Sequence, residues 1–193
     1  DEFKTKKGVE RVHTISYDCN QIGTPWPVDC NGCGLRALSV HDGLFGLFAT
    51  VDGGEPQSDA FWRQASRYKV PGIGFVNKMD RSGADFLMVV AQIKEMLGAN
   101  AVPLQLPIGA EDDFIGVVDL ITMKGVIWDM ATEGMTFKEI PVPEDMVAEA
   151  NEWRAKLIEA VAEYDDKLLE KFFDNPDSIS HEEVHEAIRK ACI

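Results

Sequence analysis

Apolar residues in the first half of the chain fall into continuous runs and helix-spaced stripes that follow one another. Leu44–Val51 and Pro71–Val76 are continuous runs, which predict two buried strands, the first of them covered on both faces. Gln57–Tyr68 and Gly83–Leu97 carry apolar residues at helical spacing, and Gly98 is the expected stop of the second helix. This alternation of strands and helices predicts a parallel sheet, as in half of a doubly wound α/β domain.

The pattern changes after about residue 110, where short apolar segments are separated by Gly or polar turns. These segments predict a small antiparallel sheet with strands at Phe114–Leu120, Gly125–Asp129 and Met135–Ile140. A long amphipathic helix is predicted from about Glu144 to Phe173. Its apolar face would consist of Val147, Ala150, Leu157, Val161, Tyr164, Leu168 and Phe172.

A final helix is predicted to begin at Ser180, which is a good N-cap residue. Glu183 would complete a capping box with Ser180, and Ile179 would pack against Val184 as a hydrophobic staple. Asn175-Pro176 is expected to close the preceding helix, because a residue before proline disfavours helical geometry.

Charge is distributed unevenly over the 193 residues, whose net charge is -14. Residues 1–110 carry 11 Lys and Arg against 12 Asp and Glu, whereas residues 111–193 carry 8 against 21. An acidic segment repels phosphate backbones, so broad RNA binding by residues 111–193 is not expected. Proteins are the expected partners of this half, and a solvated acidic surface without a partner is the open alternative.

The sequence contains no sign of a membrane segment. No apolar run approaches the roughly 18 residues that a membrane-spanning helix needs. Residues 1–7 are polar and lack the apolar core of a signal peptide. We therefore expect a soluble, cytoplasmic protein.

The cysteines offer one candidate metal site. Cys30 and Cys33 form a C-x-x-C motif, and Cys19 with His41 or His13 could complete a tetrahedral zinc set. Zinc modules more often pair two such motifs, and this chain has one. Ordinary thiols are therefore the main interpretation and no metal ligand is assigned, with zinc binding kept as an alternative.

Asn77-Lys78-Met79-Asp80 follows the second predicted strand, at the end where ligands bind in doubly wound folds. Asp80 can accept hydrogen bonds from the N1–H and the N2 amine of guanine, and Asn77 can donate to N7 or O6. The stem of Lys78 can lie over the ring. Adenine would leave a buried carboxylate unpaired, a mismatch worth a factor on the order of 10⁴. The alternative is an ordinary turn in which Asp80 caps the following helix.

Four segments together carry a family resemblance: VNKMDRSGADF (Val76–Phe86), EPQSDAFWRQASRYKVP (Glu55–Pro71), GANAVPLQLPIGAEDDFIGVVDL (Gly98–Leu120) and EANEWRAKLIEAVAEYDDKLLEKFF (Glu149–Phe173). They resemble bacterial elongation factor G, the family of translational GTPases that drives translocation on the ribosome. The resemblance extends from about residue 40 to the end of the chain.

The resemblance implies an α/β fold: a partial doubly wound, P-loop-GTPase-like GTP-binding domain over residues 1–110, with an inserted acidic α+β subdomain over residues 111–193. It implies GTP or GDP with Mg²⁺ as the ligand. The implied GTP-binding residues are Asn77, Lys78, Met79 and Asp80. In the family this insert faces the stalk of the large ribosomal subunit, so a stalk protein is the implied partner.

The second switch of the family departs from its usual pattern in this sequence. The family reads Asp-Thr-Pro-Gly-His, and a gapless alignment places Gly23-Thr24-Pro25-Trp26-Pro27 there. Gly23 replaces the Asp of the Mg²⁺ shell, Trp26 the Gly that meets the γ-phosphate, and Pro27 the His that positions the attacking water. This degenerate switch is expected to lack its chemistry. A degenerate copy, an altered fragment and unreliable residue assignments over 12–36 are three open explanations.

The phosphate-cradling pattern G-x-x-x-x-G-K-[ST] is also missing, because the dipeptide Gly-Lys does not occur in the 193 residues. The family's P-loop and first switch are expected upstream of this chain, and its final guanine-contacting loop after Ile193. We therefore assign no catalytic residue.

Three functions remain open from the sequence. The first is a fragment of an elongation factor G-like GTPase that binds guanine nucleotide and is not catalytic alone. The second is a non-catalytic module that binds the ribosomal stalk. The third is a folded remnant without a function of its own.

Overall fold

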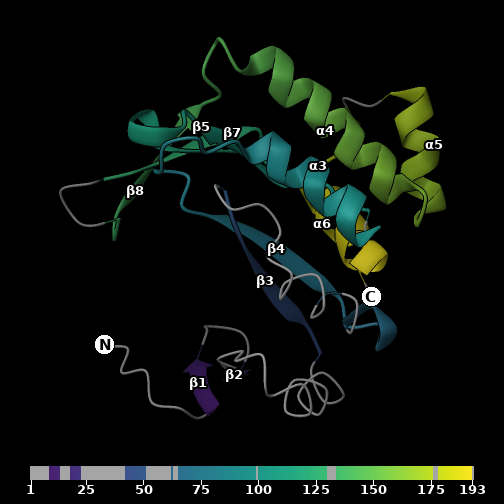
Figure 1. The fold of residues 1–193 in the computed structure, drawn as a ribbon. Coiled ribbons are helices and arrows are strands. Elements are labelled where there is room, and N and C mark those ends of the chain that lie inside the picture. The colour runs from purple at the N-terminus through teal and green to yellow at the C-terminus, as the bar shows by residue number, and fades with distance from the viewer. Residues whose placement is uncertain are drawn as a thin grey trace. The chain divides into compact units, whose positions relative to one another are not determined.

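The computed structural model describes residues 9–13, 18–22, 42–50, 62, 65–98, 100–129, 134–175 and 178–192 (Figure 1). The chain divides into two compact units, residues 1–41 and residues 42–193. In the first unit, β1 (Val9–His13) and β2 (Asp18–Ile22) form an antiparallel pair. The second unit contains every other described element, including the candidate site.

Strands β3 (Leu44–Ala49) and β4 (Gly72–Asn77) pair in parallel, with Leu44 opposite Gly72 and Ala49 opposite Asn77. This confirms the predicted parallel strands. The predicted burial is wrong, because Phe45 is 75% exposed and Phe75 is 58% exposed. These strands form a two-stranded sheet, in which Phe48 is buried and its ring lies 6.1 Å from that of Trp62.

The helix expected between these strands is described only in part. Trp62 and residues 65–67 are helical, and the remainder of its first two turns lies outside the described residues. Ala65 is buried, as its place on the apolar stripe predicts.

Helix α3 (Phe86–Leu97) follows β4 and buries Val89 and Val90. Its N-cap is Asp85, whose carboxylate accepts a 2.9 Å hydrogen bond from the N–H of Met88. Its C-cap is Gly98 at φ 58°, which confirms the predicted stop. The predicted start at Gly83 is three residues early, because Gly83 has φ +83° and cannot belong to a right-handed helix.

Four antiparallel strands in the order β5-β6-β7-β8 form the main sheet, which confirms the small antiparallel sheet predicted from the sequence. The strands are β5 (Gln105–Ile108), β6 (Gly116–Asp119), β7 (Lys124–Trp128) and β8 (Phe137–Pro141). The sequence did not predict β5. A 3-10 turn, η1 (Glu111–Asp113), connects β5 to β6. The strands of this sheet therefore lie on both sides of residue 110. The domain boundary predicted at residue 110 stays a prediction.

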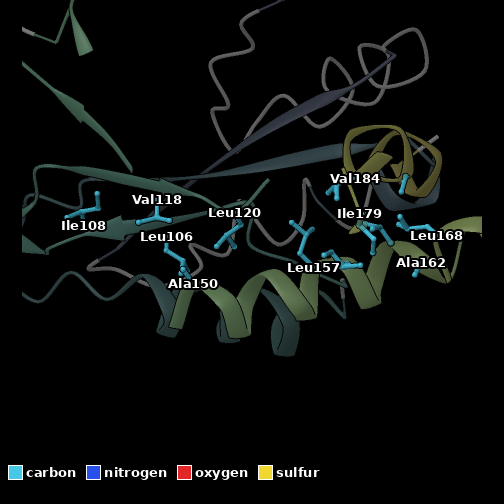
Figure 2. Packing of buried hydrophobic residues seen from close by; sticks show 13 residues of the cluster. Leu106, Ile108, Val118, Leu120, Ala150, Leu157, Ala162, Leu168, Ile179 and Val184 are labelled. Atoms are coloured by element: carbon cyan, nitrogen blue, oxygen red, sulfur yellow. The ribbon is translucent and has the colours of Figure 1, made fainter. Parts of the chain in front are cut away.

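One face of this sheet packs against helices α4 (Val147–Ala162), α5 (Asp166–Asp174) and α6 (His181–Cys192). Alternate residues of β5 and β6 belong to one buried cluster with residues of α4, as period-two strands require (Figure 2). The buried cluster consists of Leu106, Ile108, Val118, Leu120, Ala150, Leu157, Ile158, Val161, Ala162, Leu168, Ile179, Val184 and Ala187. This cluster is the main hydrophobic core of the second unit.

The single helix predicted from Glu144 to Phe173 is wrong, because the chain breaks between α4 and α5. Asp165 has extended backbone angles, and its carboxylate accepts a hydrogen bond from the N–H of Lys167 to cap α5. Two residues of the predicted apolar face also lie outside the core: Val147 is 41% exposed and Tyr164 is 56% exposed. Helix periodicity alone does not reveal a capping residue that restarts the helix.

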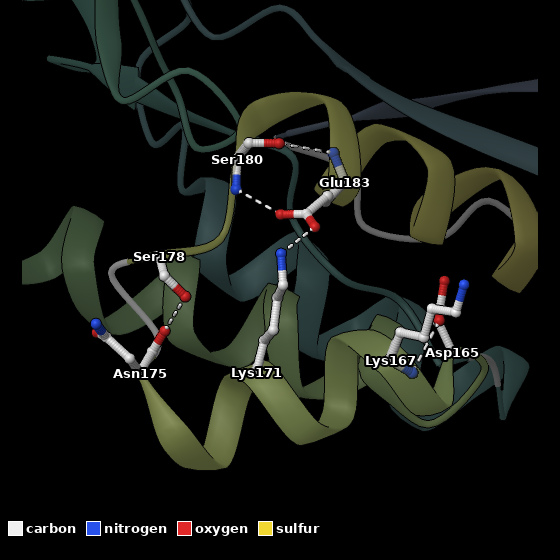
Figure 3. A network of polar contacts seen from close by, with 7 residues as sticks. All are labelled: Asp165, Lys167, Lys171, Asn175, Ser178, Ser180 and Glu183. Carbon is white, nitrogen blue, oxygen red and sulfur yellow. Dashed lines mark hydrogen bonds and ion pairs between the residues drawn. The ribbon is translucent and has the colours of Figure 1, made fainter.

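The predicted capping box of the last helix is confirmed (Figure 3). The Ser180 hydroxyl accepts from the Glu183 N–H at 3.3 Å, and the Glu183 carboxylate accepts from the Ser180 N–H at 3.0 Å. Glu183 also pairs with Lys171 of α5, which lowers the pKa of the Glu183 carboxyl. Ile179 and Val184, the predicted staple, are both buried. These contacts fasten α6 to α5.

A second ion pair joins the start of α5 to the end of α6. Lys190 donates to the Asp165 carboxylate, and this hydrogen bond lowers the pKa of Asp165 and raises that of Lys190.

Within the described part of the chain, no helix is long and apolar enough to cross a bilayer.

Candidate functional site

The predicted guanine-recognition residues form a loop at the C-terminal edge of the parallel pair. Asn77 is the last residue of β4, and Lys78, Met79 and Asp80 turn away from the strand toward α3. Asn77 and Asp80 are exposed, Lys78 is half-buried, and Met79 is buried. In doubly wound folds this edge of the sheet is where ligands bind.

Asn77 is oriented by the start of the loop itself. Its side-chain Oδ1 accepts a 2.9 Å hydrogen bond from the N–H of Lys78. This leaves the amide nitrogen of Asn77 as the group that can donate to a ligand. Lys78 adopts φ 66°, a left-handed conformation that costs a non-glycine residue about 1–2 kcal/mol. The surrounding contacts therefore offset the cost of this backbone conformation.

Thr50, immediately after β3, fixes the loop from one side. Its hydroxyl donates to the carbonyl oxygen of Lys78 at 2.8 Å, and its N–H donates to that of Asn77 at 3.3 Å. Thr50 is fully buried, at 0% exposure, and these bonds satisfy its hydroxyl and its N–H. Thr50 was not identified from the sequence, although a hydroxyl at the end of an apolar run was a visible signal.

Glu111, the first residue of η1, fixes the loop from the other side. Its backbone N–H donates to the carbonyl oxygen of Met79 at 2.9 Å. Its side-chain Oε1 accepts from the N–H of Gly83 at 2.6 Å. Glu111 itself adopts φ 56°. The role of this residue was not visible in the sequence, because its contacts reach 28 residues or more back along the chain.

The alternative interpretation, in which Asp80 caps the following helix, is wrong. The N-cap of α3 is Asp85, and Asp80 lies in the turn that precedes it. The exposed carboxylate of Asp80 is thus not required to complete α3. The loop presents Asn77 and Asp80 as a donor and an acceptor, which is the pair that guanine recognition needs.

Of the other sequence candidates, Cys19 lies on β2 and His13 on β1, and the remainder fall outside the described residues. The degenerate second switch, Gly23, Thr24, Pro25, Trp26 and Pro27, lies outside the described residues, as do Cys30, Cys33 and His41. Among the residues that are described, no group of three His, Cys, Asp or Glu side chains could hold a metal ion. We therefore assign no ligand to Mg²⁺ or zinc.

A family model, the elongation factor Tu GTP binding domain, matches residues 5–184. The chain is 59% identical over 177 residues to the elongation factor G of Cytophaga hutchinsonii, which covers 92% of this chain and 25% of that protein. It is 51% identical over 192 residues to the elongation factor G of Amoebophilus asiaticus, covering 100% of this chain and 27% of that protein.

The fold also has a solved counterpart. A crystal structure of a protein from Thermus thermophilus superposes with a TM-score of 0.82 at 22% identity, over 96% of this chain and 27% of that one. This similarity supports the α/β architecture. The chain spans about a quarter of the length of the curated relatives that it matches.

Proposed function

The chain belongs to the elongation factor Tu GTP-binding domain family, and we propose that its residues 77–80 recognise the guanine base of GTP or GDP. The observation that carries this proposal is the loop itself. Asn77 and Asp80 are exposed, while the backbone between them is fastened by Thr50 and Glu111. A recognition loop needs both properties, because ordering it on binding would cost affinity.

The chemistry assigns one task to each side chain. The Asp80 carboxylate accepts hydrogen bonds from N1–H and the N2 amine of guanine, while the Asn77 amide nitrogen donates to N7 or O6. The stem of Lys78 covers the ring, and buried Met79 anchors the loop without touching the ligand. Because Asp80 is exposed here, the discrimination against adenine should be smaller than the factor of about 10⁴ for a buried site.

The test is a titration of the chain with fluorescent GDP, with fluorescent ADP as the competing nucleotide. We expect a preference for GDP of at least about tenfold, since a hydrogen bond to a charged group contributes about 1.5 kcal/mol or more. Asp80→Ala should abolish the preference. Asp85→Ala is the matched control, because Asp85 caps α3 and should affect stability without changing the preference. Equal binding of GDP and ADP by the unchanged chain would contradict the proposal.

In the wider setting, we propose that this GTP-binding region acts with Mg²⁺ in a cytoplasmic factor that works on the ribosome during translation elongation. The relatives named elongation factor G support this setting. The 193 residues are not expected to hydrolyse GTP by themselves. Trp26 and Pro27 stand where the family has the Gly that meets the γ-phosphate and the His that positions water.

A second candidate function is binding of the ribosomal stalk by residues 111–193 without catalysis. The observation that favours it is the charge of this segment, 8 Lys and Arg against 21 Asp and Glu. Six of the 21 acidic residues lie at exposed positions of α4, α5 and the turn between them: Glu149, Glu152, Glu159, Glu163, Asp166 and Glu170. A surface of this kind suits a partner protein with a basic face.

A pull-down with purified stalk protein separates the two functions. If the acidic insert binds the stalk, the chain should be retained, and a variant with Asn77→Ala and Asp80→Ala should be retained equally. Salt should weaken the interaction, because exposed charges are screened beyond about 10 Å at 0.1 M ionic strength. Steady phosphate release from GTP, lost on Asp80→Ala, would instead show that the chain is an enzyme by itself.

A further inference from the structure

Glu111 lies between the antiparallel sheet and residues 77–80, which are called the guanine loop below. Its two hydrogen bonds reach the loop on both sides of Asp80: the backbone bond ends on Met79 and the side-chain bond ends on Gly83. Glu111 thus bonds to the residues on either side of the segment 80–82, Met79 before it and Gly83 after it. Glu111 follows Gly109 and Ala110, which connect it directly to β5.

The side-chain bond has the character of a strong one. A carboxylate that accepts from a backbone N–H makes a charge-assisted hydrogen bond, and here the Glu111 Oε1 lies 2.6 Å from the Gly83 nitrogen at an exposed position. Gly83 has φ +83°, and in this conformation its N–H meets the Glu111 oxygen. The overlapping turn 81–84 is closed by a backbone bond from the Ala84 N–H to the Arg81 carbonyl oxygen. Glu111 therefore fixes a turn that is itself closed.

We propose that Glu111 is a positioning residue for guanine recognition: its N–H and carboxylate hold the turn 79–83 so that the Asp80 carboxylate faces the base. This inference rests on the proposed function of the loop. Glu111 does not touch the nucleotide, so it acts through the placement of Asp80. It also makes the end of β5 part of the nucleotide site.

The experiment compares three variants of the full chain by amide hydrogen exchange of residues 77–84 and by fluorescent GDP titration. Glu111→Ala removes the acceptor and should speed exchange at Gly83 and weaken GDP binding, each by about three- to tenfold. Glu111→Gln keeps an oxygen acceptor and should restore both to near the unchanged chain. Asp112→Ala, at the neighbouring exposed carboxylate of η1, is the control and should alter neither.

The two readouts separate the inference from the proposed function. Faster exchange at Gly83 in Glu111→Ala, with GDP affinity unchanged and still sensitive to Asp80→Ala, would overturn the positioning role and leave guanine recognition intact. Unchanged exchange at Gly83 would show that the hydrogen bond from the Gly83 N–H to the Glu111 carboxylate does not protect this amide, and would overturn the positioning role whatever happens to GDP binding. No preference for GDP over ADP in the unchanged chain would overturn the proposed function, and with it the ligand of this inference.

Discussion

Leu157→Ala is expected to lower the free energy of unfolding by about 3–5 kcal/mol, the range for removing a well-packed core leucine. Leu157 is 1% exposed and lies on α4 at the centre of the cluster formed by β5, β6 and the three C-terminal helices (Figure 2). The truncation leaves a cavity that neighbours from several elements must collapse to fill. Because domains of this size are stable by only about 5–15 kcal/mol, the loss would be a large share of the total.

Chemical denaturation of the full chain, followed by circular dichroism, measures this loss directly. Glu159→Ala on the same helix is the matched control, since Glu159 is exposed and its removal should change stability by less than about 0.5 kcal/mol. A loss of under about 1 kcal/mol for Leu157→Ala would show that α4 does not close the core as described.

Gly109→Ala is expected to lower the free energy of unfolding by about 2–5 kcal/mol, although it adds a single methyl group. Gly109 has φ +78°, where a side chain costs about 1–2 kcal/mol. A Cβ atom there would also lie 2.0 Å from the carbonyl oxygen of Asp113, which is backbone and cannot rotate away. Relieving that overlap requires a shift of η1, at a further cost of about 1–3 kcal/mol.

Gly134→Ala is the control that separates these two contributions. Gly134 has φ +80°, but a Cβ atom there would meet nothing within 4 Å, so only the conformational cost of about 1–2 kcal/mol should appear. Denaturation midpoints of both variants give the comparison. If the two substitutions cost the same, the tight contact between Gly109 and η1 is not present in solution.

Much of the fold could be predicted from local chemistry. The parallel pair followed from apolar runs, the stop of α3 followed from Gly98, and the cap of α6 followed from Ser180 and Glu183. Each of these signals lies within a few residues of the feature that it specifies. The position of residues 77–80, the proposed guanine loop, was predictable for the same reason, because this loop directly follows a strand.

The features that were predicted wrongly or missed depend on contacts or geometry that the local sequence does not specify. Strand β5 escaped prediction because Pro107 argues against a strand, yet proline is tolerated in a strand at the edge of a sheet, where β5 lies. The break before α5 depends on the capping geometry of Asp165, which an apolar stripe does not reveal. Burial of Phe45 was inferred from the continuous apolar run Leu44–Val51, but burial depends on which elements cover a strand.

The candidate site shows the same limit. Asn77 and Asp80 could be proposed from the sequence because their residue types and spacing suit guanine. Thr50 and Glu111 could not, because each acts through contacts between segments about 30 residues apart. Residues that present a ligand group can be read from one segment, whereas residues that hold that segment in place become visible only when the fold is known.

The attachment of Glu111 to the loop bears on how this region could be exchanged between relatives. A chimaera joined at residue 110 would leave the guanine loop with one parent and take Glu111 from the other. Such a graft would change the residue that holds the turn 79–83 while leaving residues 77–80 untouched. The acidic segment 111–193 thus cannot be exchanged without changing the contacts of this loop. A chimaera that preserves these contacts should take β5, η1 and the loop from one parent.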